Sequence, residues 1–237
     1  MPEGYNAIVS VTVTQAILNI RDLLDEPNPQ FWTNAELQRW INEACADFAR
    51  RTRTLRVQTT VAVTANVQNY TAPANLLSLY RLEFQPTSTG QVFIYPLEFM
   101  GYNESDQAWG VYQTFPAAWP QMFTLWGNPP NLTIRLFPVP DQVGTLNVFG
   151  YRQSTDAVLT TDPVDILTGY EEAVYEYVVY KAQRKDKDPE FQNAKARYEE
   201  ILQGAMDNTG WYTDQPNQFT TGQSQWPPWA MAGSDWG

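Results

Sequence analysis

Apolar side chains near the start of the chain recur at spacings of three and four residues, the pattern of a helix with one buried face. The first such run predicts a helix over residues 13–26, with Thr14 as its N-cap. In the second run Thr33 stands three residues before Glu36, which is the form of a capping box. This pattern predicts a helix over residues 33–53 that ends in a cluster of arginines.

The period of the pattern then changes from 3.6 to 2. Valine, leucine, isoleucine and phenylalanine alternate with polar residues, and proline and glycine separate the runs. Such alternation predicts half-buried strands, antiparallel by preference, with one face in water. The clearest runs are 57–67, 80–84, 132–136 and 146–148. Residues 100–122 show no clear period and are expected to form a long loop.

Helical periodicity returns in the last third of the chain. Thr168 and Glu171 form a second capping-box pattern, which predicts a helix over residues 168–186. The pair Asp188-Pro189 supplies an N-cap followed by proline at the first helical position, and predicts a helix over residues 189–207. The two segments are expected to pair as a helical hairpin.

These elements predict an α+β fold in which one domain is inserted into another. Residues 1–54 and 161–208 are expected to form a discontinuous four-helix bundle. Residues 55–160 are expected to form an inserted antiparallel β-rich domain, either a sandwich or a small barrel. Residues 209–237 are expected to form an extended C-terminal arm.

The arm differs in composition from the rest of the chain. It has no Lys or Arg, is rich in Gln, Gly, Pro, Ser and Thr, and carries four of the nine Trp residues. Burying four Trp side chains yields roughly 20 kcal/mol, whereas ordering 29 residues costs about 30–60 kcal/mol. Because Trp burial alone cannot order the segment, we predict an arm that folds when it binds another chain. A tail packed on its own domain and an aromatic platform for carbohydrate are the alternatives.

Two groups of residues are therefore candidates for contact with partner proteins. The aromatic residues of the arm are Trp211, Tyr212, Phe219, Trp226, Trp229 and Trp236. The basic group at the end of the second helix is Arg50, Arg51 and Arg53. Cations at this end of a helix also favour its dipole, so helix capping and solvation are the simpler interpretation of the arginines. Contact with an acidic partner or with phosphate is the functional one.

Composition removes several classes of chemistry. The chain has no His, which excludes Ser-His-Asp and Cys-His catalysis and histidine-bound zinc. Its single cysteine, Cys45, excludes a disulfide scaffold within the chain and is expected to be a small core residue. No Gly-rich phosphate loop is present. We expect no metal, no cofactor and no catalytic residue.

The net charge of −11 argues against tight binding of DNA or RNA, because nucleic-acid-binding surfaces are normally basic. The charge does not argue against an acidic surface that lies near DNA without binding it, since like charges repel. No apolar run approaches the roughly 20 residues that span a bilayer. The first ten residues lack the basic and apolar regions of a signal peptide. We expect no membrane partner, and a protein that is intracellular or part of an assembled particle.

Paired carboxylates keep one enzymatic alternative open, because glycoside hydrolysis needs two acids at a defined separation. The candidate pairs are Asp162 with Asp165, Glu171 with Glu172, and Glu199 with Glu200. Glu171 has the position of a capping acid, and the last pair is expected on a solvated helix face. A cell-wall (peptidoglycan) glycosidase and a carbohydrate-binding module are therefore the alternatives to a structural protein.

The order of helix, helix, β insert, helix, helix and aromatic arm resembles the head-to-tail adaptor (connector) proteins of tailed bacteriophages. It looks most like the gatekeeper-type neck adaptors of short-tailed phages. The motifs that carry the resemblance are residues 31–37 (Phe-Trp-Thr-Asn-Ala-Glu-Leu), 40–44, 50–52, 73–79, 136–141 (Leu-Phe-Pro-Val-Pro-Asp), 170–174 and 186–198.

The resemblance implies a non-enzymatic virion protein that joins the portal to the tail. It implies a twelve-fold homo-oligomeric ring in the phage neck, assembled in the host cytoplasm, with double-stranded DNA passing through the central channel without specific binding. The C-terminal arm would dock on the portal or on adjacent subunits. The opposite face of the ring would bind nozzle, tail-tube or fibre proteins.

Overall fold

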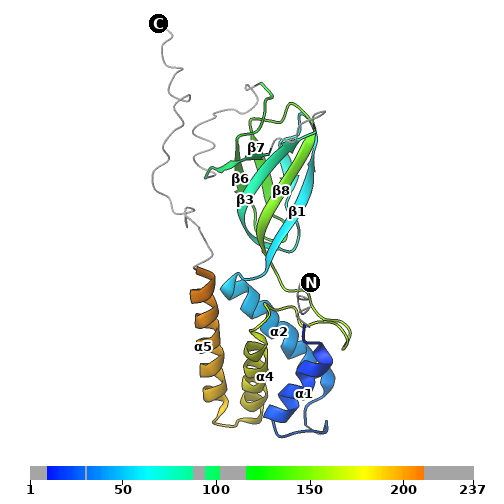
Figure 1. Ribbon diagram of the computed structural model, residues 1–237, viewed down its shortest axis with the longest axis vertical. Helices are drawn as coiled ribbons and strands as arrows, with labels where there is room; N and C mark the ends of the chain where they lie inside the picture. Colours follow the sequence, from blue (N-terminus) through cyan, green and yellow to red (C-terminus); the bar gives the residue numbers. More distant parts are fainter. Residues whose placement is uncertain (1–9, 30, 88–93, 102–115, 211–237) are drawn as a thin grey trace, which may run out of the picture.

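The computed structural model describes residues 10–29, 31–87, 94–101 and 116–210. For residues 209 and 210 it describes the backbone alone. Figure 1 shows an elongated molecule with a helical part at one end and a β-rich part at the other. The helices are α1 (Val13–Leu23), α2 (Asn34–Thr52), α4 (Glu171–Asp186) and α5 (Phe191–Gly210). The strands are β1 (Arg56–Val63), β2 (Asn69–Thr71), β3 (Leu76–Pro86), β4 (Tyr95–Pro96), β5 (Glu98–Phe99), β6 (Met122–Trp126), β7 (Thr133–Phe137) and β8 (Gly144–Arg152). The predicted α+β class is confirmed.

The first two helices begin with threonine caps. The Thr33 hydroxyl accepts a hydrogen bond from the backbone N–H of Glu36 at 3.2 Å, so this predicted cap is confirmed. The predicted cap of α1 is wrong, because Thr12 and not Thr14 precedes the helix and accepts from Gln15 N. The N–H and hydroxyl of Thr14 instead donate to the carbonyl of Thr160, so a distant segment decides which threonine caps the helix.

The start of α4 differs from the prediction, whereas Asp188 makes the predicted capping bond before α5. The residue before α4 is Tyr170, whose side chain makes no capping bond, so the second capping box is wrong. Glu171 instead accepts from Gly169 N at 2.9 Å. Before α5, Asp188 accepts from the backbone N–H of Glu190 at 2.9 Å, which satisfies one of the free N–H groups at that end.

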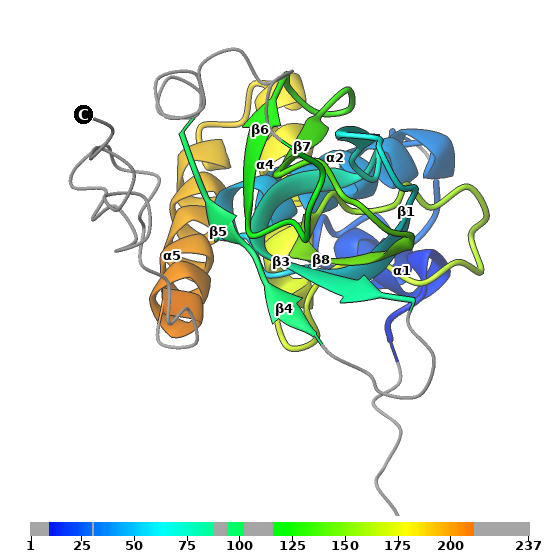
Figure 2. The same cartoon turned by 90° about the horizontal axis from the view of Figure 1, so that it is seen from above.

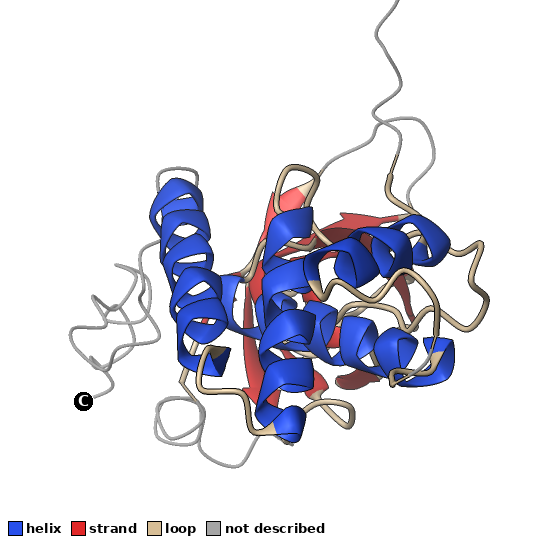
Figure 3. Ribbon diagram, turned by 90° about the horizontal axis from the view of Figure 1, so that it is seen from below, coloured by secondary structure: helices blue, strands red, loops and turns tan. Residues whose placement is uncertain are grey.

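The helices do not surround a single core, so the expected four-helix bundle is not supported. One cluster of buried residues joins α1 to α2 and α4, and includes Ile20, Ile41 and Val178. A second cluster joins α5 to α2 and α4 and includes Phe48 and Leu202. The pair α2 and α4 therefore lies in the middle, and α1 and α5 flank it from opposite sides, as Figures 2 and 3 show.

The β-rich part consists of two four-stranded sheets in the orders β1-β8-β3-β4 and β2-β7-β6-β5. The strand pairs are antiparallel apart from β5 with β6, which is parallel. Buried side chains from both sheets form one core, for example Leu82 and Phe84 from β3 with Ile134 and Leu136 from β7. Of the predicted loop over residues 100–122, residues 102–115 lie outside the described part, and Met122 begins β6.

The chain enters and leaves the β-rich part at the same place. Arg56 at the start of β1 pairs with Tyr151 near the end of β8. The N–H of Arg152 donates to the carbonyl of Leu55 at 2.9 Å. Both connections to the helical part, from α2 and to α4, therefore run side by side.

Candidate functional site

The three arginines proposed as partner contacts lie together at the C-terminal end of α2. Arg53 caps the helix in the left-handed conformation, and its N–H donates to the carbonyl of Ala49 at 3.0 Å. The guanidinium of Arg50 pairs with Asp47 at 2.6 Å, three residues earlier on the exposed side of the helix. Capping and local pairing account for these two residues, and their contact with a partner stays a prediction.

Arg51 has a more specific role, because it links α2 to α5. Its guanidinium donates two hydrogen bonds to the carboxylate of Glu199, at 3.0 and 2.5 Å. These bonds hold the pKa of Glu199 below its ordinary value. Next to them, the hydroxyl of Tyr198 donates to Asp47 at 2.8 Å, and burial together with this bond raises the pKa of Tyr198. The cluster fixes the helix from which the arm leaves the helical part.

The aromatic candidates cannot be placed in the same way. Residues 211–237, which contain all six of them, lie outside the described part of the chain. What the structure gives is where the arm starts. Figure 1 shows that the C-terminal end of α5 lies at the end of the helical part that faces the β-rich part.

The carboxylate pair Asp162 and Asp165 is engaged in holding the loop between β8 and α4. Asp162 accepts from the N–H groups of Val158 and Leu159 at 2.9 and 2.8 Å. Asp165 accepts two hydrogen bonds from Arg152 at 2.5 and 2.8 Å and one from the N–H of Thr155 at 2.6 Å. Burial works to raise the pKa of Asp165, but these bonds outweigh it, and the pKa is lowered.

A general acid for glycoside hydrolysis needs a raised pKa, and the pKa values of Asp165 and Glu199 are shifted the other way. Burial does raise the pKa of Glu176, which sequence patterns did not single out. Its carboxylate lies within α4 and faces Arg197 of α5 at 3.5 Å, which is an inter-helix ion pair. Among the described residues, no three acidic or cysteine side chains are grouped to hold a metal ion.

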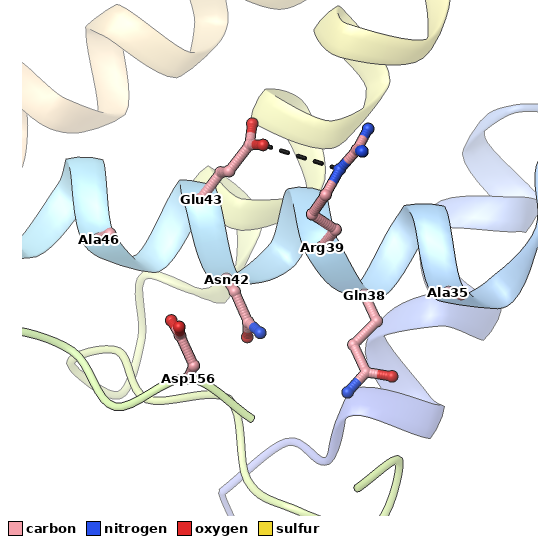
Figure 4. Close-up of a pocket in the computed structure, with 7 residues that line it drawn as sticks. All are labelled: Ala35, Gln38, Arg39, Asn42, Glu43, Ala46 and Asp156. Atoms are coloured by element: carbon pink, nitrogen blue, oxygen red, sulfur yellow. Dashed lines mark ion pairs between the residues drawn. The ribbon is translucent and has the colours of Figure 1, made fainter. Parts of the chain in front are cut away.

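A shallow cavity of about 420 Å³ lies along α2 (Figure 4). Its lining residues are Ala35, Gln38, Arg39, Asn42, Glu43, Ala46 and Asp156. Arg39 pairs with Glu43 at 3.8 Å across one helical turn. Two of the lining residues hold the loop at residues 157–162, which lies between β8 and α4. Gln38 and Asn42 both donate to the carbonyl of Ala157 in this loop. The cavity thus borders a loop that carries exposed apolar side chains.

Val158 and Leu159 at the tip of this loop are 80% and 62% exposed. Sequence patterns did not single them out, since an isolated pair of apolar residues gives no periodicity. Ala157, immediately before them, is buried against α1 and α2. Other apolar side chains, such as Phe31 and Trp126, are also exposed, but Val158 and Leu159 are two exposed apolar neighbours on a loop bonded to α2.

No helix in the described ranges has the length and apolar composition needed to cross a bilayer. The family model described as "SU10 adaptor protein" matches residues 11–225. No curated protein matches the chain. A solved structure titled "Neck of empty GTA particle computed with C6 symmetry" is 15% identical and covers 74% of this chain and 82% of that one, with a TM-score of 0.27. A TM-score of this size does not establish a common arrangement of the elements.

Proposed function

The chain belongs to the SU10 adaptor protein family, and from this we propose that it is a structural adaptor that joins the portal to the tail in the neck of a phage particle. The observation that carries the proposal is the extent of the family match. It runs from residue 11 to residue 225 and so includes both the helical and the β-rich part. The proposed location is the virion, after assembly in the host cytoplasm.

The proposal includes a ring of identical subunits around a DNA channel, twelve-fold by resemblance to phage connectors. A ring uses heterologous contacts, in which one side of each subunit meets the other side of its neighbour. The net charge of −11 supports a wall that does not hold DNA, because negative surfaces repel phosphates. Residues 1–54 and 161–208 form the unit around the channel, and residues 55–160 face the nozzle, tail-tube or fibre proteins.

Residues 209–237 are the proposed docking arm, which binds the portal or a neighbouring subunit through its Trp side chains. The composition of the arm supports this, because segments that stay disordered are poor in aromatic residues. The role is non-enzymatic. The bonds of Asp162, Asp165, Glu171 and Glu199 to neighbouring backbone or arginine groups support structural roles for these carboxylates.

The native mass of the protein tests this function directly. The full chain is measured alone and after mixing with the purified portal of the same phage. We expect a stoichiometric complex with several copies of the chain on each portal ring, and twelve copies for the symmetry proposed. A chain that does not bind the portal at micromolar concentrations contradicts the adaptor function. A complex with another copy number contradicts the twelve-fold ring alone.

A further inference from the structure

The loop at residues 157–162 is held by other parts of the chain at nearly every position. Asn42 bonds both backbone groups of Ala157, and Gln38 donates to the carbonyl of Val158 at 3.0 Å. The N–H groups of Val158 and Leu159 donate to Asp162. The N–H groups at the start of α1 donate to the carbonyls of residues 160 and 162. The loop is therefore fixed in shape before any partner binds.

Two apolar side chains, Val158 and Leu159, project from this fixed loop into solvent. Preorganised apolar groups of this kind favour protein association, because little conformational entropy is lost when they become buried. Nothing in their own loop requires them to be apolar, since its bonds use backbone groups and Asp162. The pair has the properties of an interface anchor.

The position of the loop indicates which surface would receive it. Figure 2 shows the yellow-green loop and α1 on one side of the molecule and α5 on the opposite side. Figure 3 shows the same separation from the helical end. A head-to-tail contact between copies would therefore bring the loop and α1 of one copy against α5 of the next.

The charges of the two sides are complementary. At the end of α1 and directly after it, Asp22 and Asp25 carry negative charge, whereas Glu26 is paired with Arg21 at 3.4 Å. On the other side, the first seven residues of α5 (Phe191–Arg197) carry Lys195 and Arg197 and no acid. Arg197 is paired with Glu176 of the same chain, so Lys195 is the cation offered to a neighbour at this end of α5. The side chains of Asp22 and Asp25 are exposed, and so are those of Lys195 and Arg197. Figure 1 shows the end of α1 and the beginning of α5 at the same, distal end of the helical part, so a sideways contact aligns them.

We propose that the 157–162 loop, with Val158 and Leu159 as anchors, docks on the exposed face of α5 in a second copy of this chain, a contact that rests on the proposed function as a ring-forming adaptor. Asp22 and Asp25, at the end of α1, lie in the same interface and face Lys195 of the neighbour. The contact is heterologous, so it propagates from copy to copy around a ring.

Site-directed crosslinking tests the contact in the full chain. Leu159→Cys and Glu200→Cys variants are mixed in equal amounts and treated with a short bis-maleimide, both concentrated alone and after mixing with the portal. Glu200 is chosen because it lies on the exposed face of α5. The native Cys45 does not interfere, since burial raises the pKa of its thiol to about 12. We expect dimers that link one variant to the other.

The matched control replaces Val143, an exposed valine of the β-rich part, by Cys and pairs it with Glu200→Cys. The loop pair should crosslink at least tenfold more than this control under one of the two conditions. Equal yields for both pairs, yields at background in both conditions, or a dominant link between two Leu159→Cys chains overturn the contact. A dominant link from Leu159→Cys to the portal overturns it as well.

A Val158→Ser/Leu159→Ser double variant provides a second measurement. The bonds that shape the loop use backbone groups, so the fold should be retained, which circular dichroism and thermal unfolding verify. We expect at least a tenfold weaker association between copies. A folded double variant that assembles like the wild type overturns the contact but leaves the adaptor function intact. A wild-type chain that does not join the portal contradicts that function, while crosslinks in solution still decide the loop contact.

Discussion

Asn42 of α2 pairs with the backbone of Ala157 in both directions. Its amide nitrogen donates to the carbonyl of Ala157, and its amide oxygen accepts from the N–H of Ala157, each at 3.1 Å. A helix side chain thereby takes the place of a strand partner for a loop that lies 115 residues further along the chain. The pairing supplies the partner of the Ala157 N–H and shares the Ala157 carbonyl with the amide of Gln38, so both backbone groups beside the buried Ala157 side chain are satisfied.

Replacing Asn42 by Ala should therefore loosen the 157–162 loop. The substitution removes both bonds and leaves the N–H of Ala157 unsatisfied, while the carbonyl keeps its bond from Gln38 at 2.8 Å. An unsatisfied buried donor costs about 1–3 kcal/mol of unfolding free energy. Urea denaturation measures the loss, and hydrogen exchange should be faster at the amide of Ala157. Arg39→Ala is the control on the same helix, because its side chain is exposed and makes an ion pair at 3.8 Å. Equal losses in the two variants would contradict the role of Asn42.

The ion pair of Arg152 with Asp165 predicts a pH-dependent contribution to stability. The pKa of Asp165 is lowered in the folded protein, so its carboxylate stabilises the fold at pH values above the ordinary aspartate value of 3.8. This stabilisation is lost as the pH falls below 3.8 and through the lower folded pKa. Asp165→Asn should cost about 1–2 kcal/mol at pH 7, the usual range for hydrogen bonds to a partly exposed charged group.

Unfolding by urea at several pH values checks this prediction. The difference between Asp165→Asn and the wild type should shrink as the pH falls below 3.8, because Asp165 is then protonated in the unfolded chain while the folded state still holds the carboxylate. Asp156→Asn, an exposed aspartate nearby, is the control and should change the unfolding free energy by less than about 0.5 kcal/mol. A difference for Asp165→Asn that stays constant from pH 7 to pH 3 would show that charge is not its source.

Local patterns predicted much of the helical part because the information lies within one segment. The Thr33 cap and the apolar face of α2 involve residues three or four apart, and both are present, whereas the carboxylate of Glu36 bonds Lys185. The cap of α1 was wrong because Thr14 is bound by Thr160, a contact between residues 146 apart. The arrangement of the helices could not be predicted from the apolar periodicity either, because an apolar face does not specify whether helices share one core or two.

The β-rich part shows the same division between local and distant information. Strand β6 was missed because Met122, Phe123 and Thr124 are all buried in succession, so this strand has no alternation of apolar and polar residues. For the candidate surfaces, the arginine cluster is visible in the sequence, whereas its link from Arg51 to Glu199 is not. Val158 and Leu159 stand out only once the structure shows their neighbours buried and bound.

Replacing Gly150 or Gly204 by Ala should change the unfolding free energy in opposite directions. A Cβ atom on Gly150 of β8 would lie 2.5 Å from the carbonyl oxygen of Ser78 and would also collide with the side chain of Leu76. Gly150→Ala should therefore lower the unfolding free energy by about 1–3 kcal/mol. At Gly204 of α5 no side chain and no other segment of the described chain lies within 4 Å of the Cβ position, so Gly204→Ala should raise the unfolding free energy by about 0.5–1 kcal/mol through helix propensity.

Thermal unfolding of the two alanine variants distinguishes the effects. The midpoint of unfolding should fall for Gly150→Ala and rise for Gly204→Ala. A neutral Gly150→Ala would mean that β3 and β8 can separate slightly without loss, and would contradict the close contact between these strands. A destabilised Gly204→Ala would indicate that the exposed side of α5 is covered within the subunit, which would also weaken the proposed contact between copies.

Removal of the arm distinguishes a segment that docks on another chain from a tail that packs on its own domain. A chain that ends at Gly210 keeps every residue of the three core clusters, so its unfolding free energy should stay within about 1 kcal/mol of the full chain. Association with the portal should fall at least a hundredfold, because the Trp anchors are lost. A tail packed on its own domain predicts the reverse, with lost stability and unchanged docking. Urea denaturation and a pull-down on immobilised portal measure the two quantities.

The identity of the anchors is tested in the full chain by replacing its four C-terminal tryptophans, Trp211, Trp226, Trp229 and Trp236, by Ser. This variant should dock as poorly as the truncated chain, since aromatic side chains dominate the energy of such contacts. Trp126→Ser in β6 is the matched control, because Trp126 is exposed and lies outside the arm. Normal docking by the arm variant, together with its loss on truncation, would assign the contact to the polar backbone of the arm and not to its aromatic residues.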